Sequence, residues 1–332
     1  MGIRHLNRYL RDHCPNSIRV MSMADLSGKQ IAVDISIYLY KYESENMLLE
    51  NMYLMLSIFR HHNVIPIFIF DGKPPPEKKE LLIKRKEDKQ EARQEYNKLK
   101  KCLDNNEQFD ETDKQEIIAT MDQLKKQFIH ISKSKIESVK DLIRAYGATY
   151  YDAPGEADEL CALLVLKKKV WACLSEDMDL FVYGCTRVLR YFSLINHGVV
   201  LYYMKGILEE LDISQNDFRE ICILSGTDYN INSNNNDINL TNTIKWFNKY
   251  KPPKTTNINK ANKEFLSFYE WLQANSDYIT NIDLLKTINE MFDLSIKHGQ
   301  LDNFCNIKII NGPIMDQCIE DIMREEGFIF MR

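Results

Sequence analysis

The chain has 332 residues, of which 44% are hydrophobic and 27% charged, and it contains 12 Gly and 9 Pro. This composition is typical of a globular protein and excludes collagen-like, low-complexity and disordered chains. The net charge of −5, from 43 Lys and Arg against 48 Asp and Glu, excludes a nucleic-acid-binding protein that relies on bulk positive charge, so any polyanion partner must meet a local basic patch.

The eight cysteines are spread along the chain without a Cys-x-x-Cys pair or a short Cys/His cluster. We therefore expect reduced thiols rather than a zinc site or a disulfide framework. The first residues lack the apolar core of a signal peptide, and no run approaches the ~18 apolar residues of a membrane span. These features predict a soluble intracellular protein with no membrane partner.

Three short apolar runs predict buried β-strands, and acidic residues follow each run. The runs are residues 30–33 before Asp34, residues 64–70 before Asp71, and residues 170–174 before Asp177 and Asp179. Helical patterns, such as residues 47–62 and 156–166, lie between them. Apolar runs separated by helices predict a mostly parallel sheet with helices on both faces, which is an α/β fold.

The pattern changes after Gly72 to a charged, helical stretch. Residues 73–101 carry eleven Lys and Arg against six Asp and Glu, a net charge of +5 that reverses the sign of the whole chain. We expect helices over residues 77–103 and 112–129, with a polar break between them. The charges are compatible with a solvated helix that forms i,i+4 ion pairs, or with an insertion that contacts phosphates.

After Asp228 the composition shifts toward Asn, Ile, Lys and Thr. Loops are expected at residues 233–237 and 251–256, and helices at residues 261–274 and 282–292. The last hundred residues are therefore predicted to be a helical region.

Each acidic residue has an ordinary explanation when it is considered alone. An Asp at the end of a strand commonly caps a helix or a turn, and the acids at residues 152–159 lie where a helix dipole favours negative charge. Asp228 fits a simple turn. Three strands that deliver acids to the same edge are harder to explain in this way, because ligands of open parallel sheets bind at the carboxyl ends of the strands.

Convergent carboxylates need a cation. A pair ~4 Å apart repels by ~4 kcal/mol at an effective dielectric constant of ~20. Oxygen ligands without nearby His or Cys favour Mg²⁺ or Mn²⁺ over zinc. Two such ions ~4 Å apart are suited to in-line displacement at phosphorus, so the acids predict phosphodiester hydrolysis.

Several common catalytic motifs are missing from the sequence. It contains no P-loop, no Gly-x-Gly-x-x-Gly after a strand and no Gly-x-Ser-x-Gly elbow, and its seven histidines lack metal-ligand spacing. An NTPase, a dinucleotide-dependent enzyme and a serine acyl hydrolase are therefore disfavoured.

Six segments occur in the order found in one nuclease family. They are MGI at 1–3, IAVD at 31–34 followed by Ser36 and Tyr40, FDGKPP at 70–75, APGEAD at 153–158, EDMD at 176–179 and LSGTDY at 224–229. With these segments the chain resembles the flap endonuclease (XPG) family of structure-specific 5′ nucleases. The resemblance covers roughly residues 1–230.

The resemblance implies a PIN-like nuclease core over residues 1–230, interrupted at residues 74–135 by a helical arch or clamp through which a 5′ single strand passes. Residues 231–332 would form a helical C-terminal region that diverges from the family's helix-hairpin-helix duplex-binding element. The glycine-rich Gly-Ile-Gly hairpin expected after Asp228 is missing, and residues 230–242 stand in its place. Anchoring of duplex DNA and potassium through that hairpin is therefore not expected.

The resemblance also implies the site. Two Mg²⁺ ions, for which Mn²⁺ can substitute, would be held directly or through water by Asp34, Asp71, Glu156, Asp158, Asp177, Asp179 and Asp228. Asp158 stands where the family usually has Glu, which shortens its reach by one methylene. Lys78 and Arg85, seven residues or about two helical turns apart, would stabilise the transition state. Tyr40 would stack on a displaced base, and further DNA contacts are implied at Gly2, Lys73 and Lys84.

The implied activity is cleavage of DNA at single-strand/double-strand junctions such as 5′ flaps, leaving a 5′-phosphate and a 3′-hydroxyl, in replication, repair or recombination. A 5′ exonuclease or a junction resolvase would share this core. The sequence is also compatible with a catalytically silent scaffold that binds branched DNA, and with a single-strand RNA nuclease on a related α/β fold. No sliding-clamp motif is present. The expected location is where DNA is processed, either the nucleus or a cytoplasmic site of viral replication.

Overall fold

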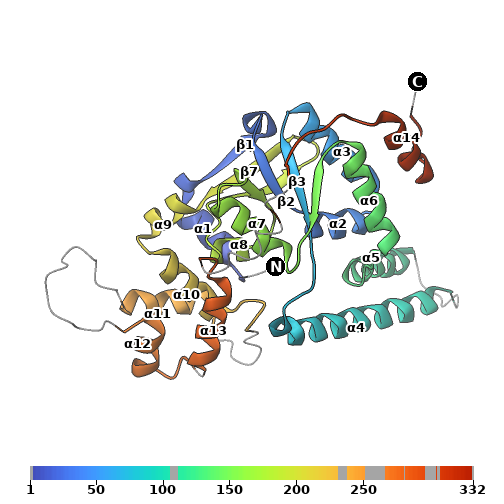
Figure 1. Cartoon of the computed structure of the whole chain (residues 1–332). Helices are drawn as coiled ribbons and strands as arrows, with labels where there is room; N and C mark the ends of the chain where they lie inside the picture. Colours follow the sequence, from blue (N-terminus) through green and yellow to red (C-terminus); the bar gives the residue numbers. More distant parts are fainter. Residues whose placement is uncertain are drawn as a thin grey trace.

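A seven-stranded mixed sheet forms the centre of the molecule (Figure 1). The structure is a computed structural model that describes residues 3–104, 111–230, 238–250, 266–279, 281–295, 304 and 307–330. The strands in chain order are β1 (Ile18–Ser22), β2 (Gln30–Asp34), β3 (Ile65–Phe70), β4 (Thr149–Asp152), β5 (Ala172–Leu174), β6 (Arg187–Ser193) and β7 (Gly198–Tyr203). They lie side by side in the order β1-β7-β6-β5-β2-β3-β4.

The sheet is mostly parallel, as predicted. Parallel pairing joins β2 to β3 and β5, β3 to β4, and β5 to β6, whereas β7 runs antiparallel to both β6 and β1. The three predicted strands are confirmed as β2, β3 and β5. The β6–β7 hairpin, β1 and β4 were not predicted.

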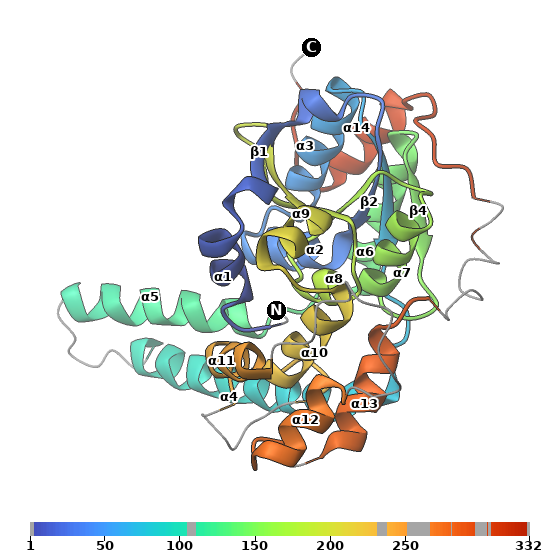
Figure 2. The same cartoon turned by 90° about the vertical axis from the view of Figure 1, so that its left-hand side faces the viewer.

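Both faces of the central strands β2, β3 and β5 are buried. In β3, Ile67 and Ile69 pack into one apolar core and Phe68 and Phe70 into the other, because successive side chains of a strand point to opposite faces. A strand covered on both faces therefore carries apolar residues at every position. Figure 2 shows the helices on the two sides of the sheet.

The helices that cover the sheet come from the whole chain. On or beside the two faces lie α1 (Leu6–His13), α2 (Ile35–Ser44), α3 (Leu48–His61), α6 (Lys133–Ala145), α7 (Ala157–Leu166), α8 (Asp179–Val182) and α9 (Met204–Leu211). The predicted α/β fold is therefore confirmed. Within the described ranges, no helix is both long enough and apolar enough to cross a bilayer.

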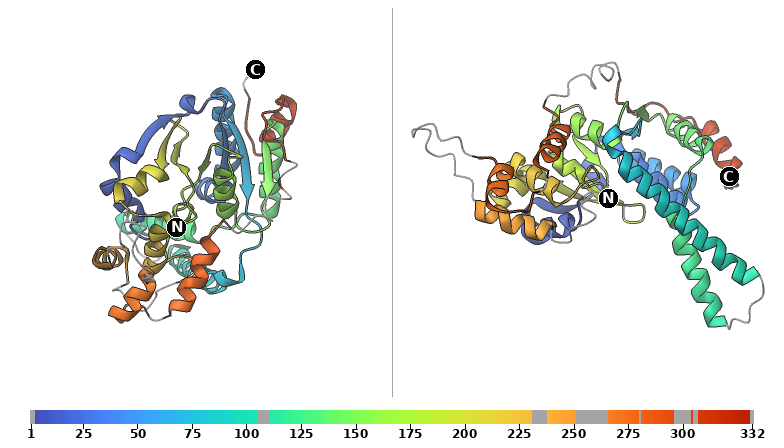
Figure 3. Two further views of the ribbon diagram at one scale, coloured as in Figure 1. Left: turned by 60° about the vertical axis from the view of Figure 1, so that its left-hand side comes forward. Right: turned by 90° about the horizontal axis from the view of Figure 1, so that it is seen from below.

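The charged stretch after Gly72 forms a helical hairpin. Its two helices are α4 (Lys79–Asp104) and α5 (Glu111–Gln127), which pack against each other and extend away from the sheet (Figure 3). The rings of Tyr96 and Phe128 meet with centroids 5.5 Å apart. The two predicted helices are thus confirmed. Helix α6 begins at Lys133, inside the predicted insertion, and packs on α3 and β4.

The C-terminal region contains α10 (Gln215–Ser225), α11 (Leu240–Tyr250), α12 (Phe268–Asn275), α13 (Ile282–Phe292) and α14 (Asp316–Glu325). The helix predicted over residues 282–292 is confirmed, and α12 corresponds to the end of the helix predicted over residues 261–274. The two loops predicted at residues 233–237 and 251–256 lie outside the described residues. The division of the chain into domains stays a prediction.

Residues 307–330 return to the sheet. The Gly312 amide donates a hydrogen bond to the Gly147 carbonyl at 2.7 Å, and the Met315 amide donates to the Ala145 carbonyl at 2.8 Å. Gly147 has a φ of +68°, and a Cβ atom there would come within 2.6 Å of the Gly312 backbone. Only glycine fits such an approach, which places α14 against α6.

Glu220 on α10 provides a test of packing in the C-terminal helices. Its side chain is 6% exposed and accepts a hydrogen bond from Asn216. Burial raises its pKa from the ordinary 4.5 to about 7. The folded state therefore binds the proton more tightly than the unfolded chain, so stability falls as the pH rises from about 4.5 to about 7.

We expect the free energy of unfolding of Glu220→Gln to exceed that of the wild type by about 3 kcal/mol at pH 8 and to differ little at pH 4.5. Urea unfolding at the two pH values measures this difference. Glu326→Gln, at an exposed position after α14, is the control. Equal stability of Glu220→Gln and wild type at pH 8 would contradict the assignment.

Candidate active site

The strand-end acids gather at one edge of the sheet. Asp34 is the last residue of β2, and Asp71 directly follows β3, which pairs in parallel with β2. Asp177 follows β5, the other parallel neighbour of β2. Glu156 lies between β4 and α7. The parallel register therefore brings acids from distant segments to the carboxyl edge, as predicted.

Asp34, at the end of β2, is buried, with 5% of its surface exposed. Burial, followed by the negative charge of Asp71, raises the pKa of Asp34 to about 7. The Ser175 hydroxyl donates a hydrogen bond to Asp34 Oδ2 at 2.8 Å and partly offsets this effect. Ser175 was not singled out from the sequence. Its position directly after β5, two residues before Asp177, was the available signal.

Three further acids influence one another directly. Burial, and then the carboxylates of Glu156 and Asp177, raise the pKa of Asp158 well above its ordinary value. Burial also raises the pKa of Asp177, as does the carboxylate of Asp228. Asp179 is 1% exposed, and burial together with Asp177 and Asp228 raises its pKa. The seven predicted acids are therefore electrostatically linked.

Lys78 is the centre of positive charge in this cluster. Its Nζ donates to Glu156 Oε1 at 2.6 Å and lies 3.8 Å from Asp228 Oδ2, although the residue is only 7% exposed. Burial lowers the pKa of Lys78, but the carboxylates of Asp158 and Glu156 outweigh it and raise the pKa above the ordinary value. Lys78 is therefore a charged side chain held among acids.

Arg85 lies two turns further along, on α4. Its guanidinium Nη2 donates to Asp228 Oδ2 at 2.9 Å. The structure thus brings both predicted basic residues to the acid cluster. Lys78 directly precedes α4, and Figure 1 shows α4 running below the sheet.

Tyr229 completes the contacts around Glu156. Its hydroxyl donates to Glu156 Oε2, and the Lys78 ammonium lies 5.0 Å from the centroid of its ring. Tyr229 belongs to the LSGTDY segment, but no role was predicted for it. The only signal was its place directly after Asp228.

The loop that carries Asp71 is fixed by close backbone packing. The Ala157 amide donates to Asp71 Oδ1 at 2.8 Å, and the Ser36 hydroxyl donates to Oδ2. The Gly72 amide donates to the Gly155 carbonyl at 2.7 Å. A Cβ atom on Gly72 would lie 1.9 Å from the Ala153 carbonyl oxygen, so only glycine allows the two loops to meet.

The remaining predicted DNA contacts lie outside this cluster. Tyr40, on α2, is 50% exposed, and the Lys89 ammonium lies 5.6 Å from its ring centroid. Lys73 and Lys84 are exposed. Gly2 lies outside the described residues.

The acids fit a hard divalent cation by their chemistry. Within the described ranges, no group of three or more His, Cys, Asp or Glu side chains is arranged to hold a metal ion as it stands. One carboxylate oxygen of Glu156 accepts a hydrogen bond from Lys78, and one of Asp228 accepts a hydrogen bond from Arg85. The buried Asp179 Oδ1, in contrast, has no hydrogen-bond partner among the described residues. An all-oxygen donor set with such an atom suits Mg²⁺ or Mn²⁺.

Two family models match the chain. The XPG N-terminal domain matches residues 1–92 and the XPG I-region matches residues 147–228. Together they cover more than half of the chain and include the seven acids, Lys78 and Arg85. The chain belongs to the flap endonuclease (XPG) family.

Curated relatives of this XPG chain are about 30% identical to it. Flap endonuclease 1 of Nematostella vectensis is 30% identical over 247 residues, which are 69% of this chain and 62% of the relative. Flap endonuclease 1 of Leishmania braziliensis is 29% identical over 251 residues, or 69% of this chain and 60% of the relative. The chain thus spans about three fifths of the length of these relatives.

Solved structures share the fold. The catalytic core of Rad2 superposes with a TM-score of 0.62 at 18% identity, covering 99% of this chain and 96% of that core. Human GEN1 in complex with Holliday junction DNA superposes with a TM-score of 0.58 at 19% identity, covering 98% of this chain and 73% of GEN1. Flap endonuclease-1 from Methanococcus jannaschii gives 0.57 at 20% identity, with 97% of each chain covered.

Asp179→Asn tests the electrostatic description of the cluster. The substitution removes one buried negative charge beside Asp177 and Asp228 while it keeps the shape of the side chain. In EDTA at pH 8 we expect the variant to melt a few degrees higher than the wild type. Asp277→Asn, at an exposed position, should leave the melting temperature unchanged. A lower melting temperature for Asp179→Asn would show that the acids do not repel one another.

Proposed function

We propose that this chain is a metal-dependent, structure-specific 5′ nuclease that hydrolyses DNA at single-strand/double-strand junctions. The observation that carries the proposal is the meeting of seven acids with Lys78 and Arg85 at the carboxyl edge of the sheet. Acids alone are compatible with any divalent-metal site. The positively charged side chains of Lys78 and Arg85, placed beside the acids, suit a reaction in which a phosphate gains negative charge.

The relatives support the substrate class. The curated relatives are named Flap endonuclease 1, and the similar Rad2 and GEN1 structures contain a DNA substrate and Holliday junction DNA respectively. We infer branched or flapped DNA as the partner of this chain.

The proposed cofactor is a pair of Mg²⁺ ions, for which Mn²⁺ can substitute. Asp34, Asp71, Glu156, Asp158, Asp177, Asp179 and Asp228 would hold them, directly or through water. When bound, such ions activate a water molecule and stabilise both oxygens of an in-line displacement at phosphorus. Ser175, Ser36 and the Ala157 amide orient two of these acids in advance through hydrogen bonds.

Lys78 and Arg85 would act on the scissile phosphate. Both already form charge-assisted hydrogen bonds with carboxylates, so their positions are set before substrate arrives. With Glu156 and Asp228 engaged in holding the metal ions, the Lys78 ammonium and the Arg85 guanidinium would be available to the phosphate oxygens. There they would stabilise the negative charge that develops during cleavage.

The remaining contacts would position the DNA. Tyr40 is exposed and would stack on a base displaced from the duplex. Lys73, Lys84 and Gly2 would contact the backbone, and α4 with α5 would form the arch over the 5′ strand. In this arrangement the net charge of +5 on residues 73–101 faces a polyanion.

A panel of labelled DNA substrates tests the proposed function. We expect Mg²⁺-dependent cleavage of a 5′ flap near its junction, with weaker or no cleavage of nicked, gapped and four-way substrates, and no cleavage in EDTA. Asp179→Asn should give no product while it still binds the flap. Binding without product at any Mg²⁺ or Mn²⁺ concentration would instead indicate a scaffold, and preference for a matched RNA flap would indicate an RNA nuclease.

Lys78→Ala separates catalysis from binding. The single-turnover rate on the preferred substrate should fall by about 10²–10³, because one lost transition-state donor costs ~3–4 kcal/mol. Lys79→Ala removes an adjacent, exposed ammonium and should retain the rate. An effect of Lys78→Ala on DNA affinity alone would make Lys78 a positioning residue.

A further inference from the structure

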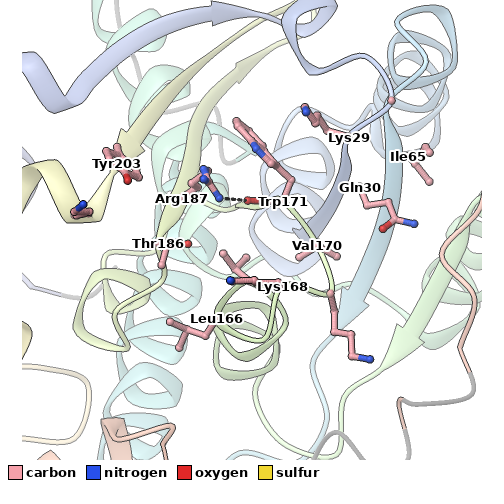
Figure 4. Close-up of a pocket in the computed structure, with 14 residues that line it drawn as sticks. Lys29, Gln30, Ile65, Leu166, Lys168, Val170, Trp171, Thr186, Arg187 and Tyr203 are labelled. Carbon is pink, nitrogen blue, oxygen red and sulfur yellow. Dashed lines mark hydrogen bonds between the residues drawn. The ribbon is translucent and has the colours of Figure 1, made fainter.

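A basic groove lies at the opposite edge of the sheet from the acids, where β2, β3 and β6 begin and α7 ends (Figure 4). Its main cavity measures about 620 Å³. A second cavity of about 390 Å³ shares three of its lining residues and so extends it. Because β2 runs for five residues between the two edges, the groove is about 16 Å from the acid cluster.

The groove is strongly positive in an acidic protein. Five cationic side chains line its main cavity: Lys29, Lys168, Lys169, Arg187 and Lys205. A sixth, Arg19, lines the extension. None of the described lining residues of the main cavity is acidic. Within the described ranges only Lys205 of these five forms an ion pair, with the exposed Glu209. The other four form no ion pair with a carboxylate of the described residues.

The positive charges surround two aromatic side chains. The Arg187 guanidinium lies 5.2 Å from the Trp171 ring centroid and 5.9 Å from that of Tyr203, and its Nη1 donates to the Trp171 carbonyl at 3.4 Å. The Lys29 ammonium lies 6.0 Å from the Trp171 ring. Tyr203 is 37% exposed. Figure 4 shows Trp171 between Lys29 and Arg187.

Local folding requirements explain only part of this arrangement. Lys168 and Lys169 follow the C-terminus of α7, where cations complement the helix dipole. Lys29 and Arg187 come from the starts of strands and serve no such purpose. Lys29, Lys168 and Lys169 are exposed and Arg187 is half-buried, so all four can reach a ligand from solvent. The mutual repulsion of these cations favours an anionic ligand.

We propose that the basic groove binds single-stranded nucleic acid, with phosphates on Lys29, Lys169 and Arg187 and a base against Trp171 or Tyr203. A positive channel with aromatic side chains along it is the general design of sequence-tolerant single-strand sites. The cavity volume is sufficient for a nucleotide. An acidic peptide would pair with the cations but leave the rings without a partner. This second site is distinct from the proposed active site.

Photo-crosslinking locates the ligand without relying on cleavage. An oligonucleotide of about eight thymidines, with 4-thiothymidine at its centre, is irradiated with the full chain in EDTA, and the adducts are mapped by mass spectrometry. We expect adducts at Trp171 or Tyr203. Adducts confined to the acid cluster and to α4 and α5 would overturn the proposal.

Charge reversal measures the contribution of the groove to affinity. Fluorescence anisotropy with the same oligonucleotide should show about tenfold weaker binding for Lys29→Glu/Lys169→Glu, and a slope of log K against log salt smaller by about 0.7 for each phosphate that the variant no longer neutralises. Lys167→Glu is the matched control, because Lys167 is exposed at the same helix end but does not line the groove. Equal affinity of Lys29→Glu/Lys169→Glu and Lys167→Glu for the oligonucleotide would contradict the proposal. Tighter binding of a poly-glutamate peptide than of the oligonucleotide would contradict it too.

The outcome is separable from that of the proposed nuclease activity. The Lys29→Glu/Lys169→Glu variant should cleave the preferred short substrate at the wild-type rate, since neither residue contacts the acids. A wild-type chain that cleaves no substrate but cross-links at Trp171 would remove the nuclease proposal and leave the groove in place. Cleavage without groove adducts would do the reverse.

Discussion

Repulsion among carboxylates is the constraint around which this molecule is built. The parallel register of β2, β3 and β5 forces acids from three strand ends into one place, and burial of Asp34, Asp158 and Asp179 removes the water that would screen them. Apolar packing on both faces of the sheet must hold this arrangement together. The repulsion at such an edge is relieved when positive charge enters it or when an acid binds a proton.

Positive charge enters from the helical hairpin rather than from the sheet. Lys78 precedes α4 and Arg85 lies on it, so the ion pairs with Glu156 and Asp228 tie the start of the hairpin to the core. These ion pairs couple the charge of the acid edge to the attachment of the hairpin. A cation that bound Glu156 and Asp228, or a phosphate that bound Lys78 and Arg85, would change both together.

Local sequence patterns encode the parts of the fold that could be predicted. Continuous apolar runs identified β2, β3 and β5, and the acids at their ends identified the edge of the sheet where the acid cluster lies. Long-range contacts left no local pattern. The roles of Ser175 and Tyr229 depend on Asp34 and Glu156, which are 141 and 73 residues away respectively. The basic groove was missed for the same reason, since Lys29, Lys169 and Arg187 meet only after folding.

The returning segment at residues 307–312 lies along the β4 edge of the sheet. Strand β4 is at the end of the strand order, and beside it the Thr149 hydroxyl donates to the Lys308 carbonyl. The Asn311 side chain donates to the Val64 carbonyl nearby. Unprotected β-edges invite intermolecular pairing and fibril growth. By covering β4, residues 307–312 make resistance to aggregation depend on a segment remote in sequence from the acids.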